Sequence, residues 1–123
     1  MKKLKVLLVD DEEDFVATLA ERLELREIET KIATDGETAL DIIGKEPFSV
    51  IVLDLMMPGL SGLEVLQRIK QMNISAPVIL LTGHGSTREG IEGMRLKAFD
   101  YLMKPLQIEE LIKKIKEAAI NNK

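Results

Sequence analysis

Five short apolar runs alternate along the chain with longer segments in which apolar residues recur every three or four positions. The runs are 4–9 (LKVLLV), 28–33 (IETKIA), 50–53 (VIVL), 77–81 (PVILL) and 99–103 (FDYLM). Their length and their content of Val, Ile and Leu predict β-strands. Continuous apolar runs such as 50–53 are typical of strands buried on both faces, whereas the more polar run 28–33 predicts a strand near an edge.

The five intervening segments predict α-helices because their apolar residues fall on one helical face. The segments are 11–26, 37–45, the stretch that follows 61, 87–97 and 108–119. Ser61 and Glu64 have the spacing of a capping box, which places the start of the third helix at this point. The fourth segment contains Gly90 and Gly93, and each costs about 1 kcal/mol relative to alanine, so we expect this helix to be the least stable.

This alternation predicts an α/β fold, a (βα)5 doubly wound five-stranded parallel sheet with helices on both faces. A length of 123 residues corresponds to one domain. We expect a single domain over 1–123 with its core at about 4–119. Residues 120–123 are then either a frayed end or the start of a truncated linker.

Composition and charge exclude several classes of function. The chain has 17 Lys+Arg against 21 Asp+Glu and a net charge of −4, which disfavours direct binding of nucleic acid. It has no cysteine and one histidine, His84, which excludes disulfides, zinc fingers and His-rich metal sites. The apolar run 6–9 is too short for a signal-peptide core, and no stretch approaches the roughly 18 apolar residues of a membrane span. We therefore expect a cytoplasmic protein without membrane association.

Polar residues at the ends of the predicted strands are the candidates for chemistry. In an open parallel sheet, ligands bind at the carboxyl ends of the strands. Four of the five predicted strands are followed there by residues that can bind a ligand, namely Asp10, Asp11, Asp54, Thr82 and Lys104.

Three carboxylates in one crevice repel one another. Two unit charges about 4 Å apart cost about 4 kcal/mol at an effective dielectric constant of 20. A bound cation relieves this repulsion, and an all-oxygen site without His or Cys suits Mg²⁺. Mg²⁺ usually accompanies a phosphoryl group, to which Lys104 would bring positive charge and the Thr82 hydroxyl a hydrogen-bond donor.

Other classes that share this fold fit the residues less well. Binding of a flavin phosphate needs an uncharged loop rich in N–H donors after the first strand, whereas the loop here is acidic from Asp10 to Asp14. A phosphatase of the haloacid dehalogenase type needs a second carboxylate two residues after its nucleophile, and Met56 stands at that position. Neither G-x-G-x-x-G nor a P-loop sequence occurs, so dinucleotide and nucleoside triphosphate binding have no support.

Four stretches together carry a family resemblance. They are VLLVDDEED (6–14), VIVLDLMMPGLSGLEVL (50–66), VILLTGHG (78–85) and FDYLMKP (99–105). In this order and spacing they resemble the receiver domain of two-component response regulators, and the resemblance covers essentially residues 4–119. It implies the receiver variant of the flavodoxin-like fold.

The resemblance implies a role for each acidic residue of the site. Asp54 would be the phospho-acceptor, phosphorylated from the phosphohistidine of a sensor histidine kinase. Asp11 and Asp54 would bind Mg²⁺ directly, together with the backbone carbonyl of Met56. Asp10 would act on the metal mostly through a water molecule.

The resemblance also implies the residues that respond to phosphorylation. Thr82 would donate a hydrogen bond to the phosphoryl group and Lys104 would pair with it. Tyr101 would be the switch aromatic whose ring turns inward when Thr82 moves toward the phosphate. Gly83 and His84 would lie at the rim of the site. The bond between Lys104 and the following proline is expected to be cis.

The implied protein is a switch that catalyses its own phosphorylation and dephosphorylation, not an enzyme that turns over a separate substrate. Its partners would be a sensor histidine kinase or phosphotransfer protein, and a downstream output domain or target protein, with a phosphorylation-dependent homodimer as a further expectation. The partner surface would comprise the fourth helix, the fifth strand and the fifth helix, the last with Lys113, Lys114 and Lys116 facing solvent. The alternative is a receiver-like interaction module that is not phosphorylated, which the complete set of five site residues disfavours.

Overall fold

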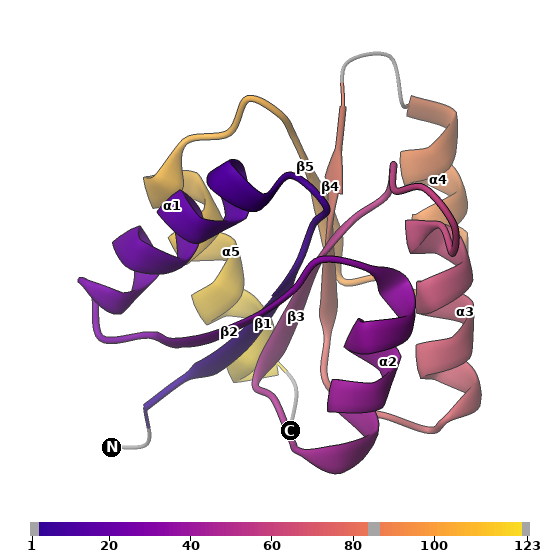
Figure 1. Ribbon diagram of the computed structural model, residues 1–123, viewed down its shortest axis with the longest axis horizontal. Helices are drawn as coiled ribbons and strands as arrows, with labels where there is room; N and C mark the ends of the chain where they lie inside the picture. The colour runs from indigo at the N-terminus through magenta and orange to yellow at the C-terminus, as the bar shows by residue number, and fades with distance from the viewer. Residues whose placement is uncertain (1–2, 84–86, 122–123) are drawn as a thin grey trace.

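The computed structural model describes residues 3–83 and 87–121, and every predicted strand and helix is present in it (Figure 1). The strands are β1 (Lys5–Val9), β2 (Glu29–Ala33), β3 (Val50–Asp54), β4 (Val78–Thr82) and β5 (Asp100–Met103). The helices are α1 (Glu13–Glu24), α2 (Gly36–Lys45), α3 (Gly62–Gln71), α4 (Thr87–Arg95) and α5 (Ile108–Asn121).

The start of α1 differs from the sequence expectation. Periodicity predicts a helix from residue 11, whereas α1 begins at Glu13. The reason is local, because Asp10 Oδ1 accepts a hydrogen bond of 3.0 Å from the backbone N–H of Glu12, whose backbone stays extended. The start of α3 follows the prediction, since Ser61 and Glu64 form the expected capping box.

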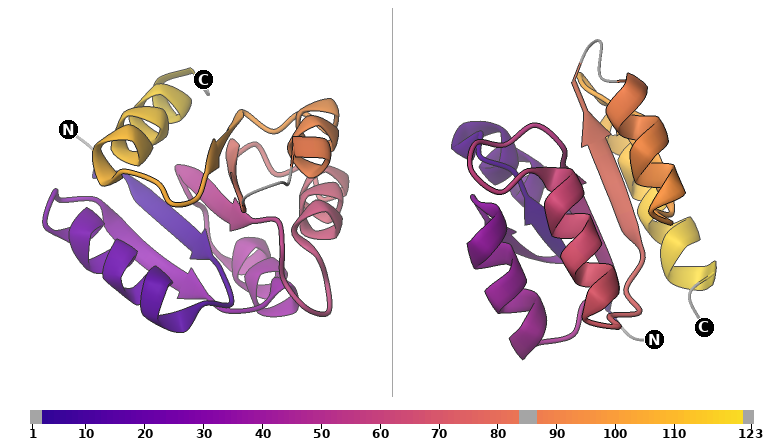
Figure 2. Two further views of the ribbon diagram at one scale, coloured as in Figure 1. Left: turned by 90° about the horizontal axis from the view of Figure 1, so that it is seen from above. Right: turned by 90° about the vertical axis from the view of Figure 1, so that its right-hand side faces the viewer.

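All five strands are parallel and lie in the order β2-β1-β3-β4-β5. Figures 1 and 2 show α1 and α5 on one face of this sheet and α2, α3 and α4 on the other. The predicted doubly wound fold is therefore confirmed. The most polar strand, β2, is at an edge, as its pattern predicts.

Each face of the sheet carries its own apolar core, because successive strand residues point to opposite sides. In β1, Val6 and Leu8 pack in the core under α1 and α5. Their neighbours Leu7 and Val9 pack in the core under α2 and α3. Burial on both sides explains why the central strands are continuous apolar runs.

The winding of the chain reverses between β1 and β3, which are neighbours in the sheet although β2 lies between them in sequence. Val9 pairs with Leu53, so the next residues, Asp10 and Asp54, lie side by side where these strands end. Such a reversal point opens a crevice at the carboxyl ends of the strands, and this topology places the two carboxylates there.

The helix surfaces show one departure from the sequence expectation. Lys114 of α5 does not simply face solvent, because its Nζ forms an ion pair of 2.6 Å with Asp100 of β5 and its side chain is half-buried. Lys113 and Lys116 are exposed as expected. None of the helices within 3–83 and 87–121 has the length and apolar character needed to cross a membrane.

The first residue of α3 lies against the end of β3. The backbone N–H of Gly62 donates a hydrogen bond of 3.1 Å to the Leu55 carbonyl. A Cβ at position 62 would clash with the backbone carbonyl of Asp54 and lie 2.6 Å from the Cα of Leu55. Only a residue without a side chain lets the helix approach this closely.

We predict that Gly62→Ala destabilises the protein by about 1–3 kcal/mol, because backbone atoms on both sides of the clash cannot move aside easily. The matched control is Gly44→Ala in α2, where the nearest atom to an added Cβ is Met72 Cε at 3.6 Å. This control should be neutral or stabilising by up to about 1 kcal/mol, as expected for alanine in a helix. Urea unfolding of both variants measures the difference, and equal stability of the two would contradict the close packing.

Candidate functional site

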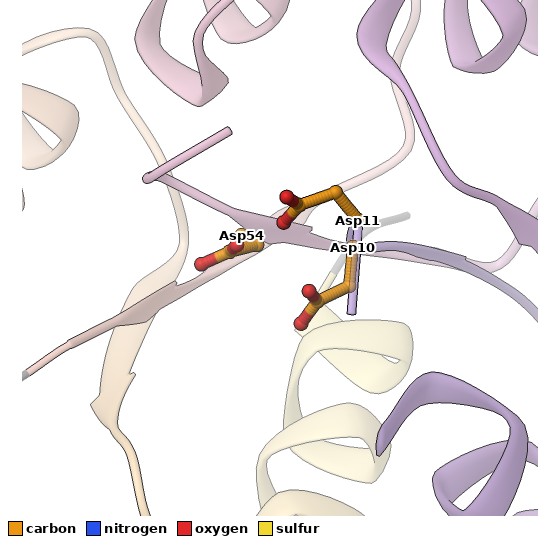
Figure 3. Close-up of side chains that lie close together, drawn as sticks. All are labelled: Asp10, Asp11 and Asp54. Atoms are coloured by element: carbon orange, nitrogen blue, oxygen red, sulfur yellow. The ribbon is translucent and has the colours of Figure 1, made fainter. Parts of the chain in front are cut away.

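Three carboxylates converge at the ends of β1 and β3. Oxygen atoms of Asp10, Asp11 and Asp54 all lie within 4.8 Å of one another (Figure 3). Asp10 is 1% exposed and Asp54 is 2% exposed, whereas Asp11 is nearer to solvent. They are the one group of three or more potential metal-ligating side chains in the part of the chain that the structure describes.

Burial and charge act on Asp54. Burial and, after it, the neighbouring charge of Asp10 raise the pKa of its carboxyl from 3.8 to about 6. Lys104 and a backbone N–H bond oppose this effect on the pKa. That bond is weak, since the Met56 nitrogen is 3.5 Å from Asp54 Oδ1. The ionised form of Asp54, which predominates near neutral pH, is therefore less favourable in the fold than it would be in water.

Lys104 provides positive charge at the same place. Its Nζ is 2.8 Å from Asp10 Oδ2, 2.8 Å from Glu12 Oε1 and 3.7 Å from Asp54 Oδ1. Burial by itself lowers the pKa of Lys104, but the bonds to Asp10 and Glu12 outweigh it and the pKa is raised. The side chain of Lys104 is therefore positively charged at neutral pH. The peptide bond from Lys104 to Pro105 is cis, as expected.

Thr82 and Tyr101 lie beside each other near α4. Thr82 is the last residue of β4 and is 2% exposed, while Tyr101 of β5 is 38% exposed. A Cβ on Gly90 of α4 would lie 3.6 Å from the Tyr101 ring and 3.8 Å from the Thr82 methyl group. Thr82 at the end of β4 and the ring of Tyr101 therefore both lie next to α4 at Gly90.

Two of the remaining predicted site residues, Met56 and Gly83, follow the ends of β3 and β4. Met56 follows β3 and is 58% exposed. Gly83 directly follows β4 and is partly buried. His84, predicted at the rim, lies outside the residues that the structure describes.

Two residues near Lys104 were missed by sequence reasoning. Glu12 reads in the sequence as part of a solvated helix start, whereas its carboxylate pairs with Lys104. The Phe15 ring reads as an ordinary apolar position of α1, whereas Lys104 Nζ lies 4.5 Å from its centroid. The spacing of these residues from Asp10 and Asp11 does not predict a contact with Lys104, because both contacts depend on where the segment after β5 places the lysine.

The donor set fits a hard divalent cation. Three carboxylates supply only oxygen atoms, and two of them are buried. Burial, and then the charge of Asp10, raise the pKa of Asp54, so a nearby positive charge would stabilise its ionised form. Hard cations such as Mg²⁺ prefer these ligands. The same crevice holds the buried carboxylate of Asp54 with the ammonium group of Lys104 3.7 Å from it, an arrangement that can neutralise charge on a bound phosphoryl group.

Comparison with known proteins identifies the family of the chain. The family model described as the response regulator receiver domain matches residues 6–116. An uncharacterized transcriptional regulatory protein of Bacillus subtilis, YkoG, is 39% identical over 122 residues, which are 99% of this chain and 54% of that protein. The transcriptional regulatory protein CpxR of Escherichia coli is 38% identical over 91% of this chain and 47% of its own. The chain thus spans about half the length of these curated relatives.

Solved structures agree with the sequence comparison. The receiver domain of the Francisella response regulator 1452 has a TM-score of 0.91 and 37% identity, covering 98% of this chain and 100% of its own. The structure titled FixJ-N has a TM-score of 0.92 and 32% identity, covering 98% and 97%. With five parallel strands, the acidic crevice and a family match over most of its length, the chain belongs to the response regulator receiver domains of two-component signal transduction.

Proposed function

We propose that the chain is a Mg²⁺-dependent phospho-acceptor switch in which Asp54 receives a phosphoryl group. The donor would be a phosphohistidine on a sensor histidine kinase or a phosphotransfer protein. The observation that carries this proposal is the convergence of Asp54 with Asp10 and Asp11 within 4.8 Å, with Lys104 Nζ 3.7 Å from Asp54 Oδ1. The family also supports this proposal. The chain matches the receiver domain family, and its relative CpxR is a transcriptional regulatory protein, not an enzyme that turns over a separate substrate.

Asp54 would act as the nucleophile. One of its carboxylate oxygens forms a bond to phosphorus while the N–P bond of the phosphohistidine breaks, and the imidazole leaves with the electron pair and takes up a proton. The nucleophile has to be ionised, and with a pKa of about 6 Asp54 is about nine-tenths ionised at pH 7. Hydrolysis of the resulting acyl phosphate by water would return the switch to its resting state.

The metal would be held by Asp10, Asp11 and Asp54, and by the backbone carbonyl of Met56. When bound, Mg²⁺ neutralises charge on the phosphoryl oxygens and on the crowded carboxylates. Lys104 would add a second positive charge, since its Nζ is 3.7 Å from Asp54 Oδ1. Phosphoryl transfer depends mostly on such positioning and charge neutralisation, which explains why so few side chains suffice.

Thr82 and Tyr101 would carry the response outward. The Thr82 hydroxyl would donate a hydrogen bond to the new phosphoryl group, and the Tyr101 ring would turn inward toward the space that Thr82 leaves. In support, Tyr101 is 38% exposed and lies with Thr82 beside Gly90 of α4. Gly83 and His84 would lie at the rim of the site, where His84 would tune access of water to the phosphoryl group.

The output surface would comprise α4, β5 and α5. In support, four large apolar side chains are exposed on α4 and β5, namely Ile91, Met94, Tyr101 and Met103. We propose that residues 1–123 form one receiver domain. Residues 120 and 121, expected from the sequence as a frayed end or the start of a linker, belong instead to the last turn of α5. Because the curated relatives are about twice as long, an output domain or a separate target protein would follow the switch, and a phosphorylation-dependent homodimer is a further form of output.

The first prediction concerns the phospho-acceptor. Wild-type protein incubated with acetyl phosphate and Mg²⁺ should gain a single phosphoryl group, detected by intact mass, and Asp54→Asn should gain none. Asp41→Asn is the matched control, because Asp41 is an exposed residue of α2 that pairs only with Lys45 among the described residues. An undiminished adduct in Asp54→Asn would refute the assignment, and no adduct on the wild type would refute the function.

The second prediction follows from the raised pKa of Asp54. Ionising this carboxyl is easier in the unfolded chain, where its pKa is 3.8, than in the fold, where it is about 6. Without metal, the protein should therefore lose up to about 3 kcal/mol of stability as the pH rises through this window. Asp54→Asn removes the charge, so it should match the wild type near pH 4 and exceed its stability above pH 7.

Urea unfolding in the presence of a chelator measures this difference at several pH values. Each comparison is made at one pH, so the titrating groups that do not interact with Asp54 cancel between wild type and variant. Asp41→Asn again serves as the control and should show no such pH-dependent gain. A constant stability difference between wild type and Asp54→Asn from pH 4 to pH 7.5 would contradict the raised pKa.

A further inference from the structure

The ammonium group of Lys104 is bound on the α1 side of the crevice, not at Asp54. Its Nζ makes hydrogen bonds of 2.8 Å to Asp10 and of 2.8 Å to Glu12, whereas Asp54 Oδ1 is 3.7 Å away. The Phe15 ring, 4.5 Å from Nζ at its centroid, borders the ammonium on the same side. At 3.7 Å the contact with Asp54 is an ion pair without a hydrogen bond.

Among the described residues, the carboxylate of Glu12 interacts with Lys104 alone. It is the N-cap residue of α1, yet its side chain makes no capping hydrogen bond, and its backbone N–H is taken by Asp10. Among the described residues, Lys104 is the one hydrogen-bond or ion-pair partner of this carboxylate. The side chain is 64% exposed, so it can leave the pair without opening the core.

The two carboxylates that hold Lys104 differ in kind. Asp10 belongs to the crowded group of three carboxylates and would share its charge with a bound cation. Glu12 lies outside that group and remains available to the ammonium whether or not a cation is present. It therefore competes with any negative group that arrives at Asp54 and attracts Lys104.

We propose that Glu12 is a positioning residue that holds Lys104 in a resting place and so weakens the phosphorylated state. This inference rests on the proposed function and concerns its regulation. Phosphorylation draws the ammonium toward the phosphoryl oxygens, and the bond to Glu12 must stretch or break. Removing the charge of Glu12 frees Lys104 for the phosphoryl group without touching Asp54 or the metal ligands.

The expected effect is moderate, because one partner of the pair is exposed. Ion pairs of this kind correspond to factors of about two to five in an equilibrium constant. Glu12→Gln should therefore bind beryllofluoride, a stable substitute for the phosphoryl group, about two- to five-fold more tightly in the presence of Mg²⁺. The amide keeps the shape of the side chain and removes its charge.

The matched control is Glu13→Gln. Glu13 is the exposed first residue of α1 and makes no ion pair with Lys104, so this variant removes the same charge one residue away. Beryllofluoride affinity is measured for wild type and both variants by calorimetry. In addition, the Lys104 side-chain resonances are followed by NMR in metal-free protein, where they should shift in Glu12→Gln and stay in place in Glu13→Gln.

Each outcome decides the proposal. A larger gain in affinity for Glu12→Gln than for Glu13→Gln, with the Lys104 resonances shifted only in the former, supports it. Equal gains in both variants indicate a general field effect and overturn it, and so does an unchanged or lower affinity in Glu12→Gln. Lys104 resonances that do not shift in Glu12→Gln also overturn the proposal. Failure of the wild type to bind beryllofluoride is a separate result, which refutes the proposed function and this inference with it.

Discussion

Electrostatic repulsion among three carboxylates is the constraint on which the rest of this structure depends. Asp10 and Asp54 are almost fully buried, and burial of a charge is costly unless another charge compensates it. Lys104 supplies part of that compensation from a segment that follows β5, more than ninety positions after Asp10. Residues far apart in the chain are therefore linked through a single ammonium group, and the three carboxylates carry more negative charge than this group neutralises.

Much of the fold follows from local sequence pattern, because burial on both faces leaves continuous apolar runs and helix starts carry caps. The run 50–53 and the pair Ser61 and Glu64 show this. The polar character of β2 correctly predicts an edge position. The full strand order does not follow, since it depends on long-range pairing that a local period does not encode, and α1 begins late because Asp10 binds the Glu12 backbone.

The candidate site is predictable to the extent that it lies at strand ends. Asp10, Asp11 and Asp54 converge because parallel strands finish at one edge of the sheet, and a reversal of winding places β1 beside β3. The environment of Lys104 was not predictable in the same way. Its side chain reaches the start of α1 and contacts Glu12 and Phe15. A helical pattern assigns Glu12 to solvent and Phe15 to packing, so neither contact is evident from it.

The interior contains few polar side chains. Among the described residues, the buried polar or charged ones are Asp10, Asp54 and Thr82, and all three stand at strand ends in the crevice. The two apolar cores contain hydrocarbon side chains and one thioether, without any ionisable group. Exchange of one of these core residues for another apolar residue thus brings no new charge near the crevice. A domain built in this way can acquire new surfaces and new neighbours while its central chemistry is preserved.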